Sequence, residues 1–564
     1  MRLNPKRGWF AAFTALFAVC AAYVFWGTWS TDMAPVMPDC ATFYPPDWFR
    51  RWVVGWLENG KFAPHDLKNF IGTPFFWQEL QYALALYCAG LGLAYFLRGR
   101  GLGRLAAYGA GLLLAFSGYW CSLFSAGHLG WFQWMTYGVF AFGLIDRALA
   151  KGKWRHWILL GACLAWGSMN QPDLWLLFSV FTAIYFIYRT IVCARARGRD
   201  PANRGDRPRE TVGTDPTKSF WTRWIAGGAA ALTVFVAIGF PSFKSAIVHD
   251  LAGRDKQIES GETLSADAAK REDARWIFVT NWSLPPEDTA EFFVPRIHGD
   301  TSCPITLALG SRVTGVTPYW GRLGRPLNAP SGNYRQHSLY VGRVTILLAI
   351  LAVVLAVVRR KKVGDGRQET RDVVFFAVAA VVFWLFSLGR FCAPVYRLVY
   401  ALPMGDYLRA PVKWHHLTEF CLCVLAGYGL AALGRLLAEK TKLSVRVISA
   451  ALGLVVLIGA CDLARIDRLY CAPQPVRADV QLAHAHLIDT PQGRAYLAQN
   501  NIRVLGRWQQ IAALGLPRRP EEPLPADALS SRPVAATSVL SAAGTLLVLA
   551  FLVLAVAAPR RFDR

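Results

Sequence analysis

Charged residues are scarce in this chain, and acidic residues are the scarcer kind. Only 17% of the 564 residues are charged, with 37 acidic against 61 basic side chains, whereas soluble domains carry about 25%. The twelve cysteines form no CxxC pair and no Cys/His spacing typical of zinc ligands. The basic stretches lack the aromatic interleaving of nucleic-acid-binding segments. These absences argue against a soluble domain, a zinc site and a nucleic-acid-binding protein.

Long apolar runs take the place of the missing charge. Hydrophobic residues make up 54% of the sequence, and they recur in runs of about 18 to 25 residues, each long enough to cross a hydrocarbon core of about 30 Å as a helix. Only helices satisfy the backbone polar groups of such runs in lipid. The sequence therefore predicts an all-α polytopic membrane protein with twelve spans, at residues 9–27, 79–97, 105–122, 131–149, 154–170, 173–192, 223–242, 341–358, 372–389, 413–436, 444–464 and 537–557.

Basic residues gather at alternate ends of these predicted spans. By the positive-inside rule, such ends face the cytoplasm, and both termini belong to this set. We therefore predict a multi-pass protein of the inner (cytoplasmic) membrane with N- and C-termini in the cytoplasm. No A-x-A-like site follows the first span, so we expect it to remain an uncleaved helix. The basic segments lie near residues 2–7, 98–104, 151–155, 195–223, 359–362, 440–446 and 560–561.

The connections on the other side are much longer than simple turns. Alternating aromatic and charged residues at 48–57 predict a helix lying at the membrane interface, and a polar stretch near 250–275 predicts a second helix. Long loops of this kind are usually functional. The predicted division is a transmembrane domain (1–465) with a first outer loop (28–78), a large outer loop (243–340) and a disordered basic cytoplasmic linker (193–222), then a short non-cytoplasmic segment (466–536) and a last helix with a cytoplasmic tail (537–564).

Three acidic residues, Asp32, Asp39 and Asp47, lie in the first outer loop soon after the first span. A carboxylate at the membrane surface could act as a general base toward an acceptor hydroxyl, or hold a divalent metal ion beside a lipid phosphate. An ordinary loop or helix-cap role is the alternative for each of them.

Two further polar groups are expected on the same membrane face. His128 ends the connection between the third and fourth spans and could bind phosphate or shuttle a proton. Asn170, Gln171 and Asp173 converge in a tight turn around Pro172, where turn chemistry and helix capping are the alternative reading. All four are candidate substrate-binding residues.

Cations on the outer side run against the positive-inside trend. Arg296 and His298 lie in the large outer loop, and Arg409 and Lys413 flank Pro411 at the tenth span. An anionic partner such as a lipid phosphate would explain their position. Snorkelling toward ordinary headgroups is the alternative.

A series of segments rich in Pro, Gly and aromatic residues follows across most of residues 1–465. In this order and spacing they resemble the YfhO family of bacterial multi-pass membrane proteins, which are related to the GT-C class of lipid-dependent glycosyltransferases. The segments are Asp39 to Pro46, Gly60 to Pro64, Gly72 to Phe75, Phe116 to Gly118 with His128 downstream, Leu284 to Glu287, Val294 to Gly299, Tyr340 to Gly342, Leu408 to Trp414 and Leu425 to Leu430.

The resemblance implies a GT-C-like fold that transfers a sugar from a polyprenyl-phosphate donor to a glycan or lipid of the bacterial envelope. In such enzymes a carboxylate of the first outer loop is catalytic, and Asp39 is the matching position here. We expect Asp39 to orient or deprotonate the acceptor hydroxyl, while Arg296, His298, Arg409 or Lys413 neutralises the leaving lipid phosphate. A divalent metal ion is the one cofactor considered, without assigned ligands.

Two other functions remain open. A transporter or flippase for lipid-linked sugars would also suit twelve helices with outward cations, but transporters normally bury ionisable residues near the bilayer midplane. The predicted spans are almost free of such charge, and Asp146 and Asp462 lie toward span ends. We therefore prefer chemistry at the membrane surface. A non-catalytic membrane scaffold is the third reading.

Overall fold

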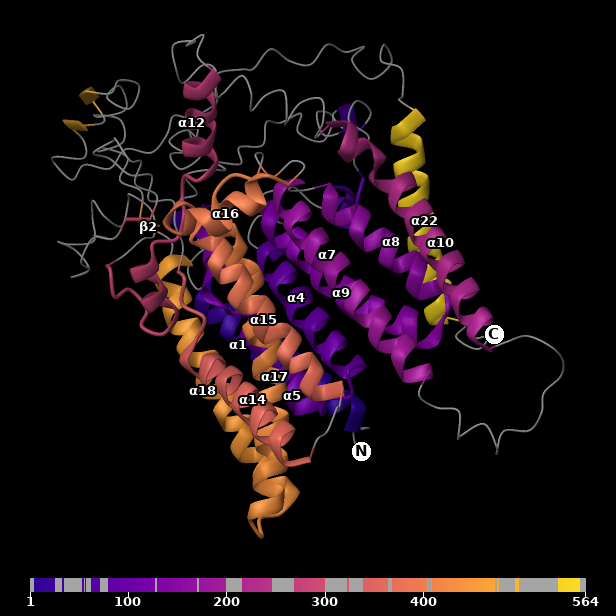
Figure 1. Cartoon of the computed structure of the whole chain (residues 1–564), viewed down its shortest axis with the longest axis vertical. Coiled ribbons are helices and arrows are strands. Elements are labelled where there is room, and N and C mark those ends of the chain that lie inside the picture. Colours follow the sequence, from indigo (N-terminus) through magenta and orange to yellow (C-terminus); the bar gives the residue numbers. More distant parts are fainter. Residues whose placement is uncertain are drawn as a thin grey trace.

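The computed structural model shows a bundle of long helices that run side by side, with shorter elements gathered over one end (Figure 1). We call this end, which carries α12 and α16, the loop end. By the predicted orientation it is the non-cytoplasmic end. The structure describes residues 5–25, 33–34, 53–54, 56, 62–71, 80–126, 129–169, 172–198, 216–245, 268–299, 322–323, 338–363, 368–402, 405, 408–471, 474–475, 492–493, 495–496 and 536–557.

Helices make up nearly all the regular structure of the described residues. The α-helices are α1 (Pro5–Val24), α4 (Leu80–Gly99), α5 (Arg104–Ala115), α6 (Gly118–Ala126), α7 (Leu129–Lys151), α8 (Trp154–Ser168), α9 (Pro172–Gly198), α10 (Pro216–Ser245), α12 (Ala268–Val279), α14 (Arg343–Val363), α15 (Gln368–Ser387), α16 (Ala393–Tyr400), α17 (His415–Lys440), α18 (Val445–Cys471) and α22 (Ala536–Ala557). Short 3₁₀ helices are η1 (Pro64–Phe70), η4 (Pro286–Phe292), η5 (Gly389–Cys392) and η7 (Pro411–Trp414), and the strands are β1 (Met33–Ala34) and β2 (Gln474–Pro475).

The all-helical membrane fold predicted from hydropathy is confirmed. Within the described residues, six helical segments are long and apolar enough to cross a membrane, and four shorter apolar helices accompany them. Each of the twelve predicted ranges contains a helix, while the number of spans stays a prediction. The six segments are Leu80–Gly99, Leu174–Arg195, Trp224–Pro241, Gln368–Ser387, Pro411–Lys440 and Val445–Cys471.

The prediction of one continuous span at 105–122 is wrong. The helix stops at Ala115 and a new helix, α6, begins at Gly118. Ser117 lies between them, and the backbone N–H of Gly118 donates across the bundle to the carbonyl of Tyr340 at 2.9 Å. A tertiary hydrogen bond therefore fixes the break, which hydropathy does not report.

Other predicted boundaries shift in the same way. Helix α9 continues to Gly198 and α10 begins at Pro216, so helix extends into both ends of the linker predicted at 193–222. The predicted polar helix near 250–275 is described only from Ala268, where α12 begins. Of the predicted interfacial helix, Val53, Val54 and Trp56 are described, and they are helical.

Helix α17 lies at the centre of the packing, in contact with α14, α15 and α5. Close approach depends on small residues. A Cβ on Gly429 of α17 would overlap the carbonyl oxygen of Leu348 on α14, and a Cβ on Gly90 of α4 would lie 2.7 Å from the carbonyl oxygen of Gly111 on α5. Helices α8, α10 and α22 pack together at one side (Figure 1).

The two short strands join distant parts of the chain. Met33 pairs with Pro475 and Ala34 with Gln474 in antiparallel register. This pairing places a piece of the predicted first outer loop beside the chain that follows α18.

Candidate functional site

The turn after η4 is built around a buried carboxylate. Glu291 accepts hydrogen bonds from the backbone N–H groups of Arg296, at 3.2 Å, and His298, at 3.0 Å. These bonds hold the chain where Arg296 has a left-handed φ of 62°, a conformation that is costly for a non-glycine residue. The Nδ1 atom of His298 lies 3.4 Å from Oε1 of Glu291 and 3.6 Å from Oδ1 of Asp288. A predicted binding residue, His298, is therefore buried between two acids.

Arg409 is held between two aromatic rings. Its guanidinium carbon lies 4.4 Å from the ring centroid of Phe278 and 4.6 Å from that of Trp282. The backbones are also joined, because the N–H of Ala410 donates to the carbonyl of Val279 at 3.0 Å. Cation–π contacts with two rings restrict the position of the guanidinium, which suits Arg409 to bind an anion from a fixed place. Lys413, one turn further on in η7, is half-buried.

These loop-end segments are fixed to the bundle. The N–H of Leu284 donates to the carbonyl of Ser387 at 2.8 Å, and the indole N–H of Trp384 donates to Thr289 Oγ1 at 3.1 Å. The ring of Phe292 packs on His415 at the start of α17, with centroids 4.3 Å apart. The turn with Arg296 and His298 and the segment with Arg409 and Lys413 thus belong to one packed surface at the ends of α15 and α17.

The binding and catalytic roles of all the predicted site residues stay predictions, and several of these residues lie outside the described part of the chain. Asp173 lies in the first turn of α9, but its side chain is outside the described part of the chain. The described residues hold no group of three or more His, Cys, Asp or Glu side chains that could bind a metal ion, so a metal site in the first outer loop is not tested. The residues outside the described ranges are Asp32, Asp39, Asp47, His128, Asn170 and Gln171.

A buried carboxylate at the start of α17 was missed by the sequence prediction. Glu419 is 0% exposed, and its Oε1 accepts hydrogen bonds from Ser117 Oγ at 2.8 Å and from the backbone N–H of Tyr119 at 3.2 Å. It therefore caps α6 at the break between α5 and α6. One turn back on α17, Nε2 of His415 lies 3.7 Å from the same oxygen, which is too far for a hydrogen bond.

A second missed carboxylate, Asp467, lies near the end of α18 and is also 0% exposed. Within the described residues neither of its oxygens makes a hydrogen bond, although the thiol of Cys121 on α6 lies against it. We call Glu419 and Asp467 the loop-end acid pair. An acidic residue inside an apolar run is itself the sequence signal for Glu419, which lies near one end of the predicted span 413–436, whereas Asp467 follows the predicted span 444–464.

Tyr340, just before α14, links this region to α18. Its hydroxyl donates to Asp462 and accepts from the backbone N–H of Arg343 at 3.1 Å. Burial, together with the bond to Asp462, raises the pKa of Tyr340 to about 12. The hydroxyl of Tyr340 therefore remains a hydrogen-bond donor at neutral pH. The backbone carbonyl of the same residue accepts the hydrogen bond from the N–H of Gly118.

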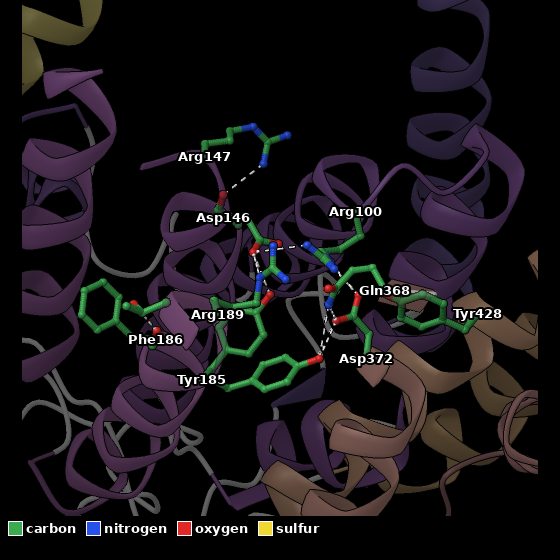
Figure 2. Close-up of polar contacts among 12 residues, drawn as sticks. Arg100, Asp146, Arg147, Tyr185, Phe186, Arg189, Gln368, Asp372 and Tyr428 are labelled. Atoms are coloured by element: carbon green, nitrogen blue, oxygen red, sulfur yellow. Dashed lines mark hydrogen bonds and ion pairs between the residues drawn. The ribbon is translucent and has the colours of Figure 1, made fainter. Parts of the chain in front are cut away.

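Four charged side chains form a second cluster toward the opposite end of the bundle, shown in Figure 2. We call Arg100, Asp146, Arg189 and Asp372 the far-end charge network. Asp146 accepts from Arg189 Nε at 2.6 Å and lies 3.6 Å from Arg100. Asp372 accepts from Arg100 Nε at 2.9 Å. Two cations and two anions alternate, so their charges balance.

Neutral donors complete the network. Asp372 also accepts from the hydroxyls of Tyr188 and Tyr428, both at 2.9 Å, and from the amide of Gln368 at 2.6 Å (Figure 2). A cavity of about 120 Å³ opens beside Arg100, Asp372 and Tyr428, which is room for several water molecules. The network ties α7, α9, α15 and α17 to the end of α4.

Comparison with known proteins gives little further guidance. No protein-family model matches the chain, and no curated protein matches it. Among solved structures it is similar to the crystal structure of the Archaeoglobus fulgidus oligosaccharyltransferase in the apo form, with 12% sequence identity and a TM-score of 0.36. The match covers 88% of this chain and 60% of the archaeal one. At this level the similarity establishes neither a shared fold nor a shared activity.

Proposed function

We propose that this protein is a membrane glycosyltransferase of the GT-C kind. It would move a sugar from a polyprenyl-phosphate donor to an envelope glycan or lipid on the non-cytoplasmic side. The observation that carries the proposal is the fixed guanidinium of Arg409, held between Phe278 and Trp282 on the loop-end surface that also bears Arg296. A guanidinium held in a fixed place suits a phosphate, which it can bind through two parallel hydrogen bonds.

The proposed reaction is a single displacement at the anomeric carbon. The acceptor oxygen forms the new bond to this carbon while the bond to the donor phosphate oxygen breaks, and the electron pair leaves with the lipid phosphate. Asp39 takes the proton of the acceptor hydroxyl. Arg409, with Arg296 and Lys413, stabilises the negative charge that develops on the phosphate.

Transfer of radiolabelled sugar from polyprenyl-phosphate donors to envelope lipids or polymers tests this proposal. We expect Asp39→Asn to lower the rate by roughly 100-fold or more, as loss of a general base does, in membranes with matched expression. Arg409→Gln should also lower it strongly. Arg322→Gln is the matched control, because this loop-end arginine also packs on a ring, that of Phe391, but is engaged by Glu287. Equal rates in wild type and Asp39→Asn would remove Asp39 from the mechanism.

The loop-end acid pair favours a second candidate function. Buried ionisable residues within membrane helices are typical of transporters, and Glu419 and Asp467 fit that description. The alternative is therefore a transporter or flippase of lipid-linked sugars. Movement of labelled donor across proteoliposome membranes, without any sugar transfer, would favour it over the transferase.

A further inference from the structure

The loop-end acid pair has few groups that could stabilise negative charge. One oxygen of Glu419 accepts two hydrogen bonds, but Oε2 makes none with the described residues, and neither oxygen of Asp467 makes one. Taking an ionised carboxylate out of water without a partner costs several kcal/mol, and such groups neutralise instead. Both side chains are completely buried, so this cost applies to Asp467, and at Glu419 the two hydrogen bonds to one oxygen offset only part of it.

Among the residues that the structure describes, the neighbours of the pair supply no permanent positive charge. Across the described ranges, no Arg or Lys forms an ion pair with Glu419 or Asp467. Among the described residues, the titratable side chains that face them are Cys20 from α1, Tyr119 and Cys121 from α6, His415 and Cys423 from α17, and Cys471 from α18. Of these, only His415 can become a cation, and its nitrogen lies beyond hydrogen-bonding distance of Glu419.

We propose that Glu419 and Asp467 each hold a proton at neutral pH, so that the pair is a buried proton-binding site joining α6, α17 and α18. The proposal does not depend on the glycosyltransferase assignment. Loss of the proton from Glu419 would place a charge on the carboxylate that caps α6 through Ser117 and Tyr119. Proton binding is thereby coupled to the geometry of the α5–α6 break, which is what a proton-driven change of helix position requires.

Infrared spectroscopy of the full chain in lipid bilayers tests the charge state directly. We expect carbonyl-stretch bands of protonated carboxylic acids at neutral pH, which shift in D₂O. Glu419→Gln should remove one component and Asp467→Asn another. Asp372→Asn is the control, because this carboxylate accepts hydrogen bonds from the guanidinium of Arg100 and we expect no such band from it. Absence of these bands, or bands that both single variants leave unchanged, would overturn the proposal.

A substitution of His415 separates this proposal from an ion pair between its imidazolium and Glu419. If Glu419 is neutral, His415→Asn leaves the Glu419 band in place. If the wild type holds a charged pair, the band is missing from wild type and appears in His415→Asn, which contradicts the proposal.

Thermal unfolding provides a second measurement that does not require spectral assignment. An amide has the shape of a neutral carboxylic acid, so Glu419→Gln should change the Tm by less than about 2 °C. Asp372→Asn should lower it clearly further, because Arg100 then loses its carboxylate partner. A loss in Glu419→Gln as large as in Asp372→Asn would show that Glu419 is ionised. Should Glu419→Gln fail to fold, Glu419→Asp must shift the carbonyl band of this residue, and an unshifted band counts against the proposal.

Discussion

Asp372 and Glu419 are equally hidden in the same bundle, yet their surroundings differ. Asp372 accepts hydrogen bonds from Arg100, Tyr188, Tyr428 and Gln368, whereas Glu419 accepts two, from a hydroxyl and a backbone N–H. Tyr428 and Glu419 are on the same helix, nine residues or about 14 Å apart along its axis. Within this short distance, one buried acid has hydrogen-bond donors for both carboxylate oxygens and the other has donors for only one.

The difference separates a structural role from a functional one. A carboxylate with donors for both oxygens, such as Asp372, rigidifies the helices that it joins, whereas a buried polar group without enough donors costs the fold free energy. The rest of the far-end charge network is less complete, because Oδ2 of Asp146 and Nη1 of Arg189 make no hydrogen bond with the described residues. The far-end charge network has balanced charge and joins five helices. Within the described residues the loop-end acid pair has no Arg or Lys partner, and it lies at a broken helix.

The largest expected effect is loss of the central cation of the network. Arg100→Met leaves Asp372 and Asp146 buried with fewer partners, and we expect it to destabilise the protein by about 3–5 kcal/mol. Thermal unfolding in a mild detergent measures the loss. The control is Arg147→Met. Within the described residues this neighbouring arginine contacts neutral groups, namely the carbonyls of Gly143 and Tyr95 and the ring of Tyr95. Its interaction with Asp146 is only electrostatic, without a hydrogen bond between the two side chains that the structure describes.

A double variant sharpens this result. Arg100→Met with Asp372→Leu removes one cation and one anion together, and replacement of a whole buried pair by apolar residues is often close to neutral. We expect it to recover part of the stability lost in Arg100→Met. Equal losses in the single variants of Arg100 and Arg147 would contradict the assignment of a balanced network.

A smaller effect is expected at the loop end. Ser117→Ala removes one of the two donors to Glu419 and should cost about 1 kcal/mol, as loss of a single hydrogen bond does. It should also move the Glu419 carbonyl band to higher frequency, because the carbonyl loses a donor. Ser387→Ala is the control, since this buried serine at the end of α15 donates only to the local carbonyl of Trp384. A band that moves equally in both variants would contradict the bond to Glu419.

Hydropathy could predict the helices because lipid leaves the backbone no alternative to internal hydrogen bonds. Arg409 and Lys413 can be singled out from the sequence as well, because they run against the positive-inside trend, and their outward orientation stays a prediction. Their surroundings could not be predicted. The rings that hold Arg409 come from Phe278 and Trp282, more than a hundred residues earlier in the chain.

The acid pair and the network escaped prediction for the same reason. Ser117 and Glu419 are 302 residues apart in sequence, and Arg100 and Asp372 are 272 apart. A single acid within an apolar run does not reveal whether a cation or only a hydroxyl will face it. Whether a cation or a hydroxyl faces the acid decides the charge of the acid. This neighbour is set only when α4, α5 and α6 pack against α15 and α17.

The smallest expected effect concerns an ion pair at the surface of the loop end. Arg322 binds Glu287 through two hydrogen bonds of 2.6 and 2.8 Å, and this guanidinium lowers the pKa of Glu287 below its usual value. A carboxyl whose pKa is lowered by folding stabilises the fold above its unfolded pKa, about 4.3, and this contribution is lost as the pH falls through the lower folded pKa. Both side chains are more than a third exposed, so solvent screens the pair and the effect stays small.

Glu287→Gln should therefore lower the Tm slightly at pH 7, and the difference from wild type should vanish in acid. High salt should reduce it at neutral pH as well, because exposed charges are screened. The buried carboxylate of Asp372 behaves differently, since salt screens its contact with Arg100 much less and the loss in Asp372→Asn should persist. A Glu287→Gln difference that survives both acid and salt would mean that packing of the side chain, rather than its charge, holds Arg322 at this surface.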